Sequence, residues 1–192
     1  MKTFLLVAFT ACLLPGTLPA KEKTLFSSPN KQWSLLVGTP TTEGEPVPVS
    51  IVETKSLTEQ VAFPDLTAPL LAQAKVVWSG DSKRFAYYHP FRRGGACEVF
   101  FLVDGKWMEM KLPALPEPPD APTPNGDPVE ETPVSEDLKP LRWLGDGALV
   151  VARARQDISA GKTYRCEAVS TVSWVEGKEP TVRNVTKSVR KL

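Results

Sequence analysis

Residues 76–87 have the sequence VVWSGDSKRFAY, in which two apolar runs flank a central group of turn-forming residues. Serine and aspartate side chains bond to nearby backbone N–H groups, and glycine reaches left-handed conformations, so this centre favours a tight turn. The flanking runs are rich in β-branched and aromatic residues, which favour strands. No segment of residues 21–192 shows a sustained 3.6-residue apolar period over about eleven residues, the signal of an amphipathic helix. The stretch therefore predicts strand, turn, strand, and an all-β protein.

The same pattern recurs along the chain. WSGD at residues 78–81 is repeated as WLGD at 143–146, and each copy is followed by an apolar strand, an arginine-containing excursion and a Cys-Glu pair. Each copy closes with an acidic-Gly-Lys turn, at 104–106 and at 176–178. A weaker copy comes first, at residues 28–37. We expect three antiparallel β-meander units that stack on one another, because one such sheet cannot bury both of its faces alone.

The expected strands are short and are bounded by Gly, Pro, Asn and Asp. They cover Trp33–Val37, Val47–Glu53, Val76–Trp78, Phe85–Tyr88, Glu98–Val103, Trp107–Leu112, Ala148–Ala152, Thr163–Trp174 and Thr181–Val185. Residues 66–74 could form a helix, which Pro69 limits to a turn or two. The basic residues after position 186 are expected to be a frayed, solvated end.

Residues 76–87 resemble the blade signature of TolB-type and related WD40-like β-propellers, in which a W-S-P-D-G-K turn and an apolar strand recur in every blade. Residues 28–35 and 143–149 match this signature more loosely. The resemblance implies blade-like meanders and names no ligand. Because closed propellers have about four to eight blades, three units imply an open blade-like array, a sandwich of the same meanders, or part of an oligomer.

The first twenty residues have the pattern of a secretory signal peptide. The apolar run at residues 4–14 is too short to cross a bilayer core of about 30 Å, and Ala20 supplies a small residue at the expected cleavage point. An alternative is that FTAC, ending at Cys12, is a bacterial lipobox, which would make the protein a lipid-anchored envelope subunit. We expect an exported protein, periplasmic or extracellular, with one β-repeat domain over residues 21–192.

The charge balance constrains the partners. The chain has 23 Lys and Arg against 22 Asp and Glu, and loss of Lys2 with the signal peptide makes the mature protein neutral. A neutral chain offers no electrostatic case for binding nucleic acid, and no later segment is apolar enough to span a membrane. We expect a partner such as another envelope protein, recognised by local shape and charge, and oligomerisation is also open.

A proline-rich, acidic stretch separates the second and third units. Residues 113–140 hold nine of the 19 prolines. Proline removes backbone donors and the acidic residues are well solvated, so we expect an extended surface loop that packs no core and is expendable for folding. A proline-rich ligand for an SH3-like partner is the alternative.

Cys97 and Cys166 are the cysteines that remain after the predicted cleavage. An even number in an oxidising compartment, at corresponding repeat positions, favours a disulfide between neighbouring units. The alternative is two buried thiols too far apart to be bridged.

The best candidate contact surface lies at the end of the strand expected at residues 85–88. Arginine and tyrosine are favoured at interfaces, and Gly94-Gly95 would let the loop bend. The candidate residues are Tyr88, His89, Phe91, Arg92 and Arg93. The alternative is a solvated loop tip whose aromatic side chains fold into the core.

Motifs for catalysis, metal binding or cofactor binding are missing from the sequence. His89 is its one histidine, and no G-x-S-x-G, P-loop, G-x-G-x-x-G or His/Cys cluster is present. We therefore expect no catalytic residues, metal or cofactor, and a non-catalytic binding or scaffold protein. The alternative is a small periplasmic hydrolase that uses a carboxylate pair. Asp81 and Asp146 are the repeat-related acids, although their positions in turns already explain them.

Overall fold

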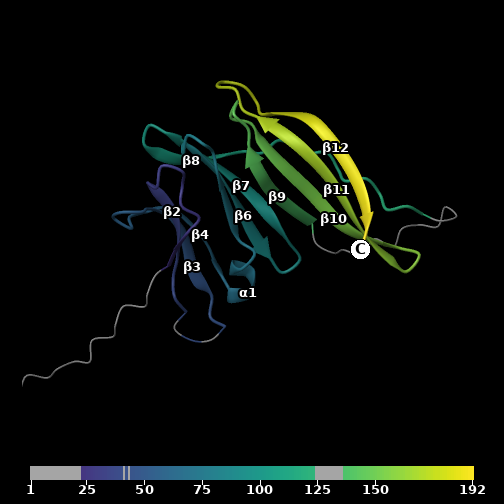
Figure 1. Ribbon diagram of the computed structural model, residues 1–192, viewed down its shortest axis with the longest axis horizontal. Coiled ribbons are helices and arrows are strands. Elements are labelled where there is room, and N and C mark those ends of the chain that lie inside the picture. The colour runs from purple at the N-terminus through teal and green to yellow at the C-terminus, as the bar shows by residue number, and fades with distance from the viewer. Residues whose placement is uncertain (1–22, 41, 43, 124–135) are drawn as a thin grey trace, which may run out of the picture.

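The computed structural model describes residues 23–40, 42, 44–123 and 136–192, and these residues form β-strands and one short helix (Figure 1). The prediction of an all-β protein is confirmed. The helix, α1 (Ala68–Leu71), is a single turn with a proline in its first turn, as expected from the sequence. Cys12 and the predicted signal peptide lie outside the described residues.

The strands form three consecutive four-stranded antiparallel meanders. The first meander is β1 (Lys23–Leu25), β2 (Trp33–Val37), β3 (Val47–Glu53) and β4 (Glu59–Leu66). The second meander is β5 (Lys75–Trp78), β6 (Arg84–Phe91), β7 (Gly94–Val103) and β8 (Lys106–Met110). The third meander is β9 (Glu136–Trp143), β10 (Leu149–Ser159), β11 (Lys162–Ser173) and β12 (Thr181–Lys191).

The second and third meanders join in one curled, eight-stranded mixed sheet. The join is a short parallel pairing in which Gly94 and Gly95 of β7 lie opposite Glu136 and Asp137 of β9. Gly94 has a φ of 140°, and a Cβ there would lie 2.1 Å from the carbonyl oxygen of Glu136, so this close approach requires glycine. The described strands form an open array and not a closed ring of blades.

The turns between the first two strands of the meanders are closed by similar hydrogen bonds. In the second meander, the N–H of Ser79 donates to the carbonyl of Arg84 at 2.9 Å, and the N–H of Ser82 donates to the carbonyl of Ser79 at 3.0 Å. The turn that begins at Ser28 has both bonds at the same spacing. The turn that begins at Leu144 is one residue shorter, because its closing bond runs from the N–H of Leu144 to the carbonyl of Ala148. The residues with positive φ at the fourth turn position are Lys31, Ser82 and Gly147. The repeat seen in the sequence is therefore a repeat of backbone structure.

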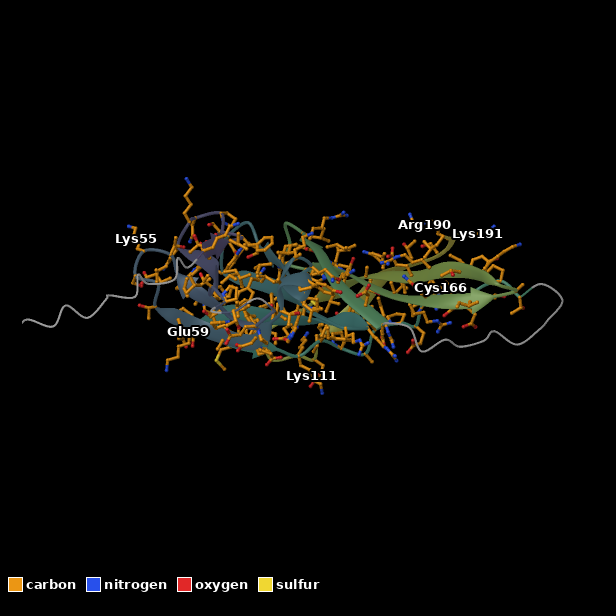
Figure 2. The ribbon with its side chains drawn as sticks, turned by 90° about the horizontal axis from the view of Figure 1, so that it is seen from below. Lys55, Glu59, Lys111, Cys166, Arg190 and Lys191 are labelled. Carbon is orange, nitrogen blue, oxygen red and sulfur yellow. The ribbon has the colours of Figure 1, made fainter. Side chains whose placement is uncertain are left out.

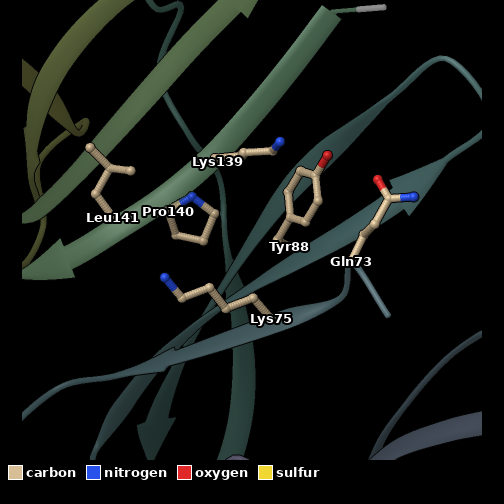
Figure 3. A pocket seen from close by; sticks show the side chains of 6 residues that line it. All are labelled: Gln73, Lys75, Tyr88, Lys139, Pro140 and Leu141. Carbon is tan, nitrogen blue, oxygen red and sulfur yellow. The ribbon is translucent and has the colours of Figure 1, made fainter. Parts of the chain in front are cut away.

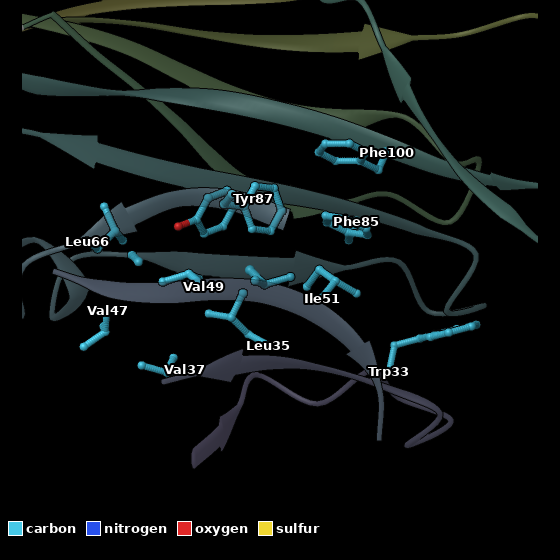
Figure 4. Packing of buried hydrophobic residues seen from close by; sticks show 13 residues of the cluster. Trp33, Leu35, Val37, Val47, Val49, Ile51, Leu66, Phe85, Tyr87 and Phe100 are labelled. Carbon is cyan, nitrogen blue, oxygen red and sulfur yellow. The ribbon is translucent and has the colours of Figure 1, made fainter. Parts of the chain in front are cut away.

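Two apolar layers hold the meanders together. The layer between the first and second meanders contains Trp33, Leu35, Phe85, Tyr87 and Phe100, all buried (Figure 4). The layer between the second and third meanders has smaller members, which are Ala86, Cys97, Val99, Leu149, Val151 and Val172. Phe85 and Tyr87 of β6 therefore face the first meander and Ala86 faces the third, because successive side chains of a strand point to opposite faces.

Tryptophan side chains make the same contact across both layers. The indole Nε1 of Trp78 donates to the carbonyl of Phe26 at 2.5 Å, and that of Trp143 donates to the carbonyl of Val77 at 3.0 Å. Phe26 and Val77 each stand two residues before the first residue of their turn. Trp78 and Trp143 are half-buried, because one edge of each indole stays at the boundary between meanders.

The proline-rich stretch differs from its prediction. Residues 111–123 belong to no helix or strand, but Ala121 is only 4% exposed and its N–H donates to Asp157 of β10 at 3.3 Å. The hydroxyl of Ser159 donates to the carbonyl of Pro122 at 2.7 Å. The expectation that this stretch packs no core is wrong, because Leu112 and Leu115 pack against the layer between the second and third meanders. Its backbone also meets polar groups that the third meander presents. Residues 124–135 lie outside the described residues, and residues 136–140 belong to β9.

Arginine side chains complete this docking. Arg153 of β10 donates to the carbonyl of Leu115 at 3.0 Å and pairs with Glu117 at 2.7 Å. Arg155 pairs with Asp120 at 2.5 Å. We call residues 112–123 the strap, because they cross the face of the third meander from which these arginines project.

The C-terminal end also differs from its prediction. Strand β12 continues to Lys191, with Arg190 opposite Arg165, and the N–H of Leu192 donates to the carbonyl of Thr163 at 2.9 Å. The basic residues after position 186 are therefore part of the sheet and not a frayed end.

Cys97 and Cys166 are separate free thiols, which corrects the predicted disulfide. Cys97 lies in the layer between the second and third meanders, close to Val99. Cys166 lies on β11, where its Sγ donates to Asp157 at 3.3 Å beside the strap (Figure 2). The aligned Cys-Glu pairs occupy different environments because β10 and β11 are longer than β6 and β7.

Candidate functional site

Two pockets lie where the second and third meanders meet. One has a volume of about 290 Å³ and the other about 250 Å³, and Gln73 lines both. The first is lined by Gln73, Lys75, Tyr88, Lys139, Pro140 and Leu141 (Figure 3). The second is lined by Leu70, Gln73, Phe91, Arg92, Arg93, Gly94 and Asp137. We call the two together the junction cleft.

Tyr88 is placed by the sheet around it. Strand pairing sets it opposite Lys75 on β5 and opposite Cys97 on β7. A Cβ added to Gly95 would lie 2.3 Å from the Tyr88 ring, so the ring lies flat on a position that must be glycine. The same short glycine stretch that joins β7 to β9 therefore also positions the phenol of the cleft.

A polar network crosses the cleft. The Tyr88 hydroxyl donates to Asp137 Oδ1 at 2.5 Å, and Asp137 Oδ2 pairs with Lys139 Nζ at 3.0 Å. Lys139 Nζ also lies 4.9 Å from the centre of the Tyr88 ring, a cation–π arrangement. Burial, followed by the contact with Asp137, raises the pKa of Tyr88 above its ordinary value, so the phenol stays protonated and remains a donor.

The remaining charges around the cleft are positive. Lys75, Arg92 and Arg93 are exposed, and within the described ranges none of them forms an ion pair with a carboxylate. Asp137, the one acid that lines the two pockets, is already paired with Lys139. The cleft therefore presents cations and hydrogen-bond donors, the groups that bind an anion.

Four of the five predicted contact residues line the cleft. Tyr88 lines one pocket, and Phe91, Arg92 and Arg93 line the other. His89 points to the opposite face of β6, where its Nδ1 lies 3.2 Å from Glu98 Oε1 and its ring lies 5.9 Å from that of Tyr87. Alternation along the strand separates it from Tyr88.

Eight of the twelve residues that line the cleft were not predicted as contact residues from the sequence. Lys75 stands just before the strand expected at residues 76–78, Gln73 lies in the stretch 66–74 expected to form a short helix, and neither belongs to a motif. Asp137 and Lys139 were assigned to the proline-rich loop, whereas they lie on β9. One signal for a strand was present in the sequence. Leu138 stands between the charged residues Asp137 and Lys139, which begins an alternating polar and apolar pattern that Pro140 interrupts.

Asp81 and Asp146 have structural roles in their turns. Asp81 Oδ1 accepts from the Ser79 hydroxyl at 2.6 Å and from the Lys83 N–H at 3.0 Å. Burial opposes its ionisation, but these bonds and nearby Arg84 outweigh it and lower the pKa of Asp81. Asp146 accepts from the Ala148 N–H at 3.1 Å and pairs with Arg183, and both contacts lower its pKa.

The two thiols are poor nucleophiles. Burial, followed by Glu98, raises the pKa of Cys97 to about 12. Burial and the hydrogen bond to Asp157 raise the pKa of Cys166 to about 11. Because the thiolate is the reactive form, neither side chain is activated at neutral pH.

No protein-family model, curated protein or solved structure matches this chain. The part of the chain that the structure describes contains no helix with the length and apolar character needed to cross a membrane. Within those same residues, no three His, Cys, Asp or Glu side chains are grouped closely enough to hold a metal ion.

Proposed function

We propose that the protein is an exported, non-catalytic binding or scaffold module whose junction cleft recognises an anionic group on a partner in the cell envelope. One observation carries this proposal: Lys75, Arg92 and Arg93 surround an open cleft and have no carboxylate partner among the described residues. Basic side chains are usually paired with a carboxylate or solvated. Three unpaired basic side chains beside one concave site therefore favour an anionic ligand.

The polar network in the cleft supports binding over catalysis. Tyr88 is held as a donor and Asp137 is neutralised by Lys139, so neither group is free to take a proton from a substrate. The carboxylates suggested for a hydrolase, Asp81 and Asp146, already accept hydrogen bonds within their own turns. We therefore favour the binding module.

The three stacked meanders support the blade-like interpretation of the repeats. Each has four antiparallel strands, and the indole contacts of Trp78 and Trp143 repeat between successive meanders. We propose that the chain is a partial, propeller-like array, as the resemblance to TolB-type and WD40-like blades implies. A cleft between successive units is then a natural place for a ligand, because concave sites form where units meet.

The experiment compares two double variants of the mature protein. Arg92→Ala/Arg93→Ala removes two cations from the cleft, and Lys55→Ala/Lys106→Ala removes two exposed cations elsewhere, one from a turn and one from the start of β8. Each protein is immobilised, exposed to envelope extract and eluted with salt. We expect the first variant to lose the partner that the wild type recovers and the second to keep it. Equal recovery by both variants, with unchanged circular dichroism, would remove the cleft from consideration.

A further inference from the structure

Strand β12 is the longest of the strands that lie at the edges of the two described sheets. It pairs with β11 on one side, and no described strand pairs with its other side (Figure 1). Residues 183–192 are all exposed. A sheet edge presents unpaired backbone N–H and C=O groups, so it can accept a strand from another chain.

The corresponding strands of the other two meanders offer poorer edges. The fourth strand of the first meander, β4, contains Pro64, which has no N–H to donate. The fourth strand of the second meander, β8, has five residues. Strand β12 has eleven residues and no proline. The third meander therefore ends in a long edge on which every residue carries a backbone donor.

A β-bulge divides this edge into two parts. Asn184 has a φ of 52°, and Asn184 and Val185 together stand opposite Ser170 of β11. A bulge bends its strand and interrupts the regular pairing. Beyond it, the register with β11 runs without a shift from Thr186 to Lys191. We call residues 186–191 the open edge, because they are the regular part of the strand.

One hydrogen bond fixes which backbone groups of the open edge face outward. The N–H of Leu192 donates to the carbonyl of Thr163, next to β11, at 2.9 Å. In an antiparallel pair, alternate residues direct both of their backbone groups to the same neighbouring strand. The N–H and C=O groups of Ser188 and Arg190 therefore also face β11. The residues whose backbone groups face away from β11 are Lys187, Val189 and Lys191.

The charged side chains of the open edge are all basic. Lys187, Arg190 and Lys191 are exposed and form no ion pair among the described residues, and the open edge contains no acid. Lys187, Val189 and Lys191 alternate along the strand, so their side chains share one side of the sheet. Arg190 and Lys191 lie at the surface (Figure 2). A strand that pairs here meets two lysines with an exposed valine between them.

We propose that β12 is a docking edge for an antiparallel β-strand of a partner protein, with acidic residues opposite Lys187 and Lys191 and an apolar residue opposite Val189. Side chains directly opposite each other on paired strands interact, and opposite charges stabilise the pair. Because these three positions carry the outward backbone groups, the incoming strand has the spacing Glu-x-Val-x-Glu. Antiparallel pairing matches the described strand pairs, of which only the short contact between β7 and β9 is parallel.

A second copy of this chain fits the edge less well than an acidic strand. Two open edges paired about Val189 would place Lys187 opposite Lys191, and like charges opposite each other destabilise a strand pair. The edge is also separate from the junction cleft, because β10 and β11 lie between β9 and β12 in the sheet. This inference therefore goes beyond the proposed function, and its tests do not depend on the cleft.

The first test follows amide hydrogen exchange of the unaltered protein by NMR, with a peptide of about nine residues built around Glu-Thr-Val-Thr-Glu. In the free protein, the amides of Ser188 and Arg190 should exchange slowly and the three outward amides quickly. With peptide, exchange at Lys187, Val189 and Lys191 should slow by at least about tenfold, because these amides then donate to the peptide. No slowing at up to about 1 mM peptide would overturn the proposal.

Two N-methylated forms of the peptide separate strand pairing from attraction between charges. Methyl groups on the nitrogens of Val and one Glu remove donors that face β12, and they should weaken binding by at least about tenfold. Methyl groups on the nitrogens of the two Thr lie on the far edge of the peptide and should change the affinity by less than about threefold. Equal affinities of the two forms would show that the backbone does not pair, and the docking edge would be wrong.

Variants at one position of β12 test the same pairing from the side of the protein. Val189→Pro removes an N–H that faces away from β11, a place where a strand tolerates proline, so circular dichroism should stay that of the wild type. It should weaken the unmodified peptide by at least about tenfold. Val189→Thr keeps the N–H and the β-branched shape, and it should change the affinity by less than about threefold. Similar affinities of these two variants would contradict pairing at Val189.

A pair of double variants tests the chemistry of the occupant. Lys187→Ala/Lys191→Ala should weaken the peptide by about fivefold, because two cross-strand pairs of opposite charge are lost. Lys55→Ala/Lys106→Ala removes two exposed cations from the first two meanders and should change the affinity by less than about twofold. Equal weakening by both would indicate attraction by net charge alone and would remove the acidic strand as the occupant.

Sedimentation of the protein without peptide tests the second copy. We expect a monomer, since Lys187 and Lys191 of two copies would repel each other across the edge. A dimer that Val189→Pro dissociates would show that a second copy occupies the open edge, and the proposed partner strand would be wrong.

Discussion

The two boundaries between meanders join similar units by different means. The boundary between the first and second meanders is aromatic: Phe85 is fully buried, and across the boundary the ring of Phe63 stacks on that of Tyr87 at 4.0 Å and the ring of Trp33 lies 5.5 Å from that of Trp107. The boundary between the second and third has a buried core of smaller side chains, with the partly exposed rings of Phe101, Trp143 and Trp174 packed against it. Beyond that core the third meander is covered by the strap and its ion pairs. The stabilisation from burying apolar surface depends little on the relative orientation of the side chains, whereas hydrogen bonds between charged groups require one particular geometry. The first boundary should therefore contribute most to stability and the second should be more sensitive to single polar changes.

The largest effect is expected in the aromatic boundary. Phe85→Ala should lower the free energy of unfolding by about 3–5 kcal/mol, because it removes a buried ring and leaves a cavity. Met108→Ala, at a residue that is 52% exposed on β8, is the control and should cost less than about 0.5 kcal/mol. Urea unfolding measures both. A cost for Phe85→Ala close to that of the control would contradict an aromatic boundary.

A smaller effect is expected where the strap docks. Asp157 is 4% exposed and accepts from the Ala121 N–H, Arg155 and the Cys166 thiol. Asp157→Ala should cost about 2–3 kcal/mol, because it leaves buried donors without an acceptor. Chemical denaturation gives the stability, and limited proteolysis should show faster cleavage within the strap.

Glu117→Gln is the control for this boundary. Glu117 also binds an arginine, Arg153, but its side chain is 65% exposed, so its loss should cost less than about 1 kcal/mol. If Asp157→Ala lowers the free energy of unfolding no more than Glu117→Gln does, the buried hydrogen bonds of Asp157 do not hold the strap in place.

The tryptophan contacts should be nearly equal at the two boundaries. Trp78→Phe and Trp143→Phe each remove one indole N–H bond and part of a half-buried ring, at an expected cost of about 1–2 kcal/mol. Thermal unfolding of both variants side by side provides the measurement. A difference of more than about 2 kcal/mol between them would show that the two indoles have different roles despite their matching geometry.

The smallest effect concerns the shared turn. Asn30 in the first turn accepts a hydrogen bond from the N–H two residues later, as Asp81 does in the second. Asp81→Asn should therefore change stability at pH 7 by less than about 0.5 kcal/mol.

Acid should separate the two forms of this turn. The pKa of Asp81 is lowered in the fold, so its ionised form adds stability that is present above the unfolded pKa and is lost as the pH falls through the folded pKa. Unfolding midpoints at pH 7 and below about pH 4 should show that Asp81→Asn loses less stability in acid than the wild type. Identical acid sensitivity would rule out this contribution.

The strand and turn patterns were predictable from sequence because they depend on neighbours in the chain. The turn at Ser79 and the hairpin around Asp104-Gly105 follow from local preferences, and both are present. Strand β9 was missed because its residues, Glu136–Trp143, follow a proline-rich stretch and include Pro140. What makes this segment a strand is its pairing with β10 and β7, which no local pattern contains.

The candidate site was predictable only in part for the same reason: four of its twelve lining residues were named from the sequence. Tyr88, Phe91, Arg92 and Arg93 stand together in the sequence, and the hairpin keeps them together. Lys139 reaches the cleft only because β9 joins the sheet beside Gly95. Likewise, the strap could not be foreseen from proline content, since its binding depends on arginines that come 38 and 35 residues later in the chain.

The indole contacts also bear on the order in which the chain acquires its structure. They join residues that are 52 and 66 positions apart, whereas the strands within one meander follow one another directly. Local pairings close short loops and form early, so each meander can assemble before it meets the next. During synthesis the first meander emerges first, and its face of Trp33, Leu35 and Val37 has no cover until Phe85 and Phe100 follow. That interval is when an incomplete chain is most prone to associate with others, since exposed apolar strands are aggregation-prone.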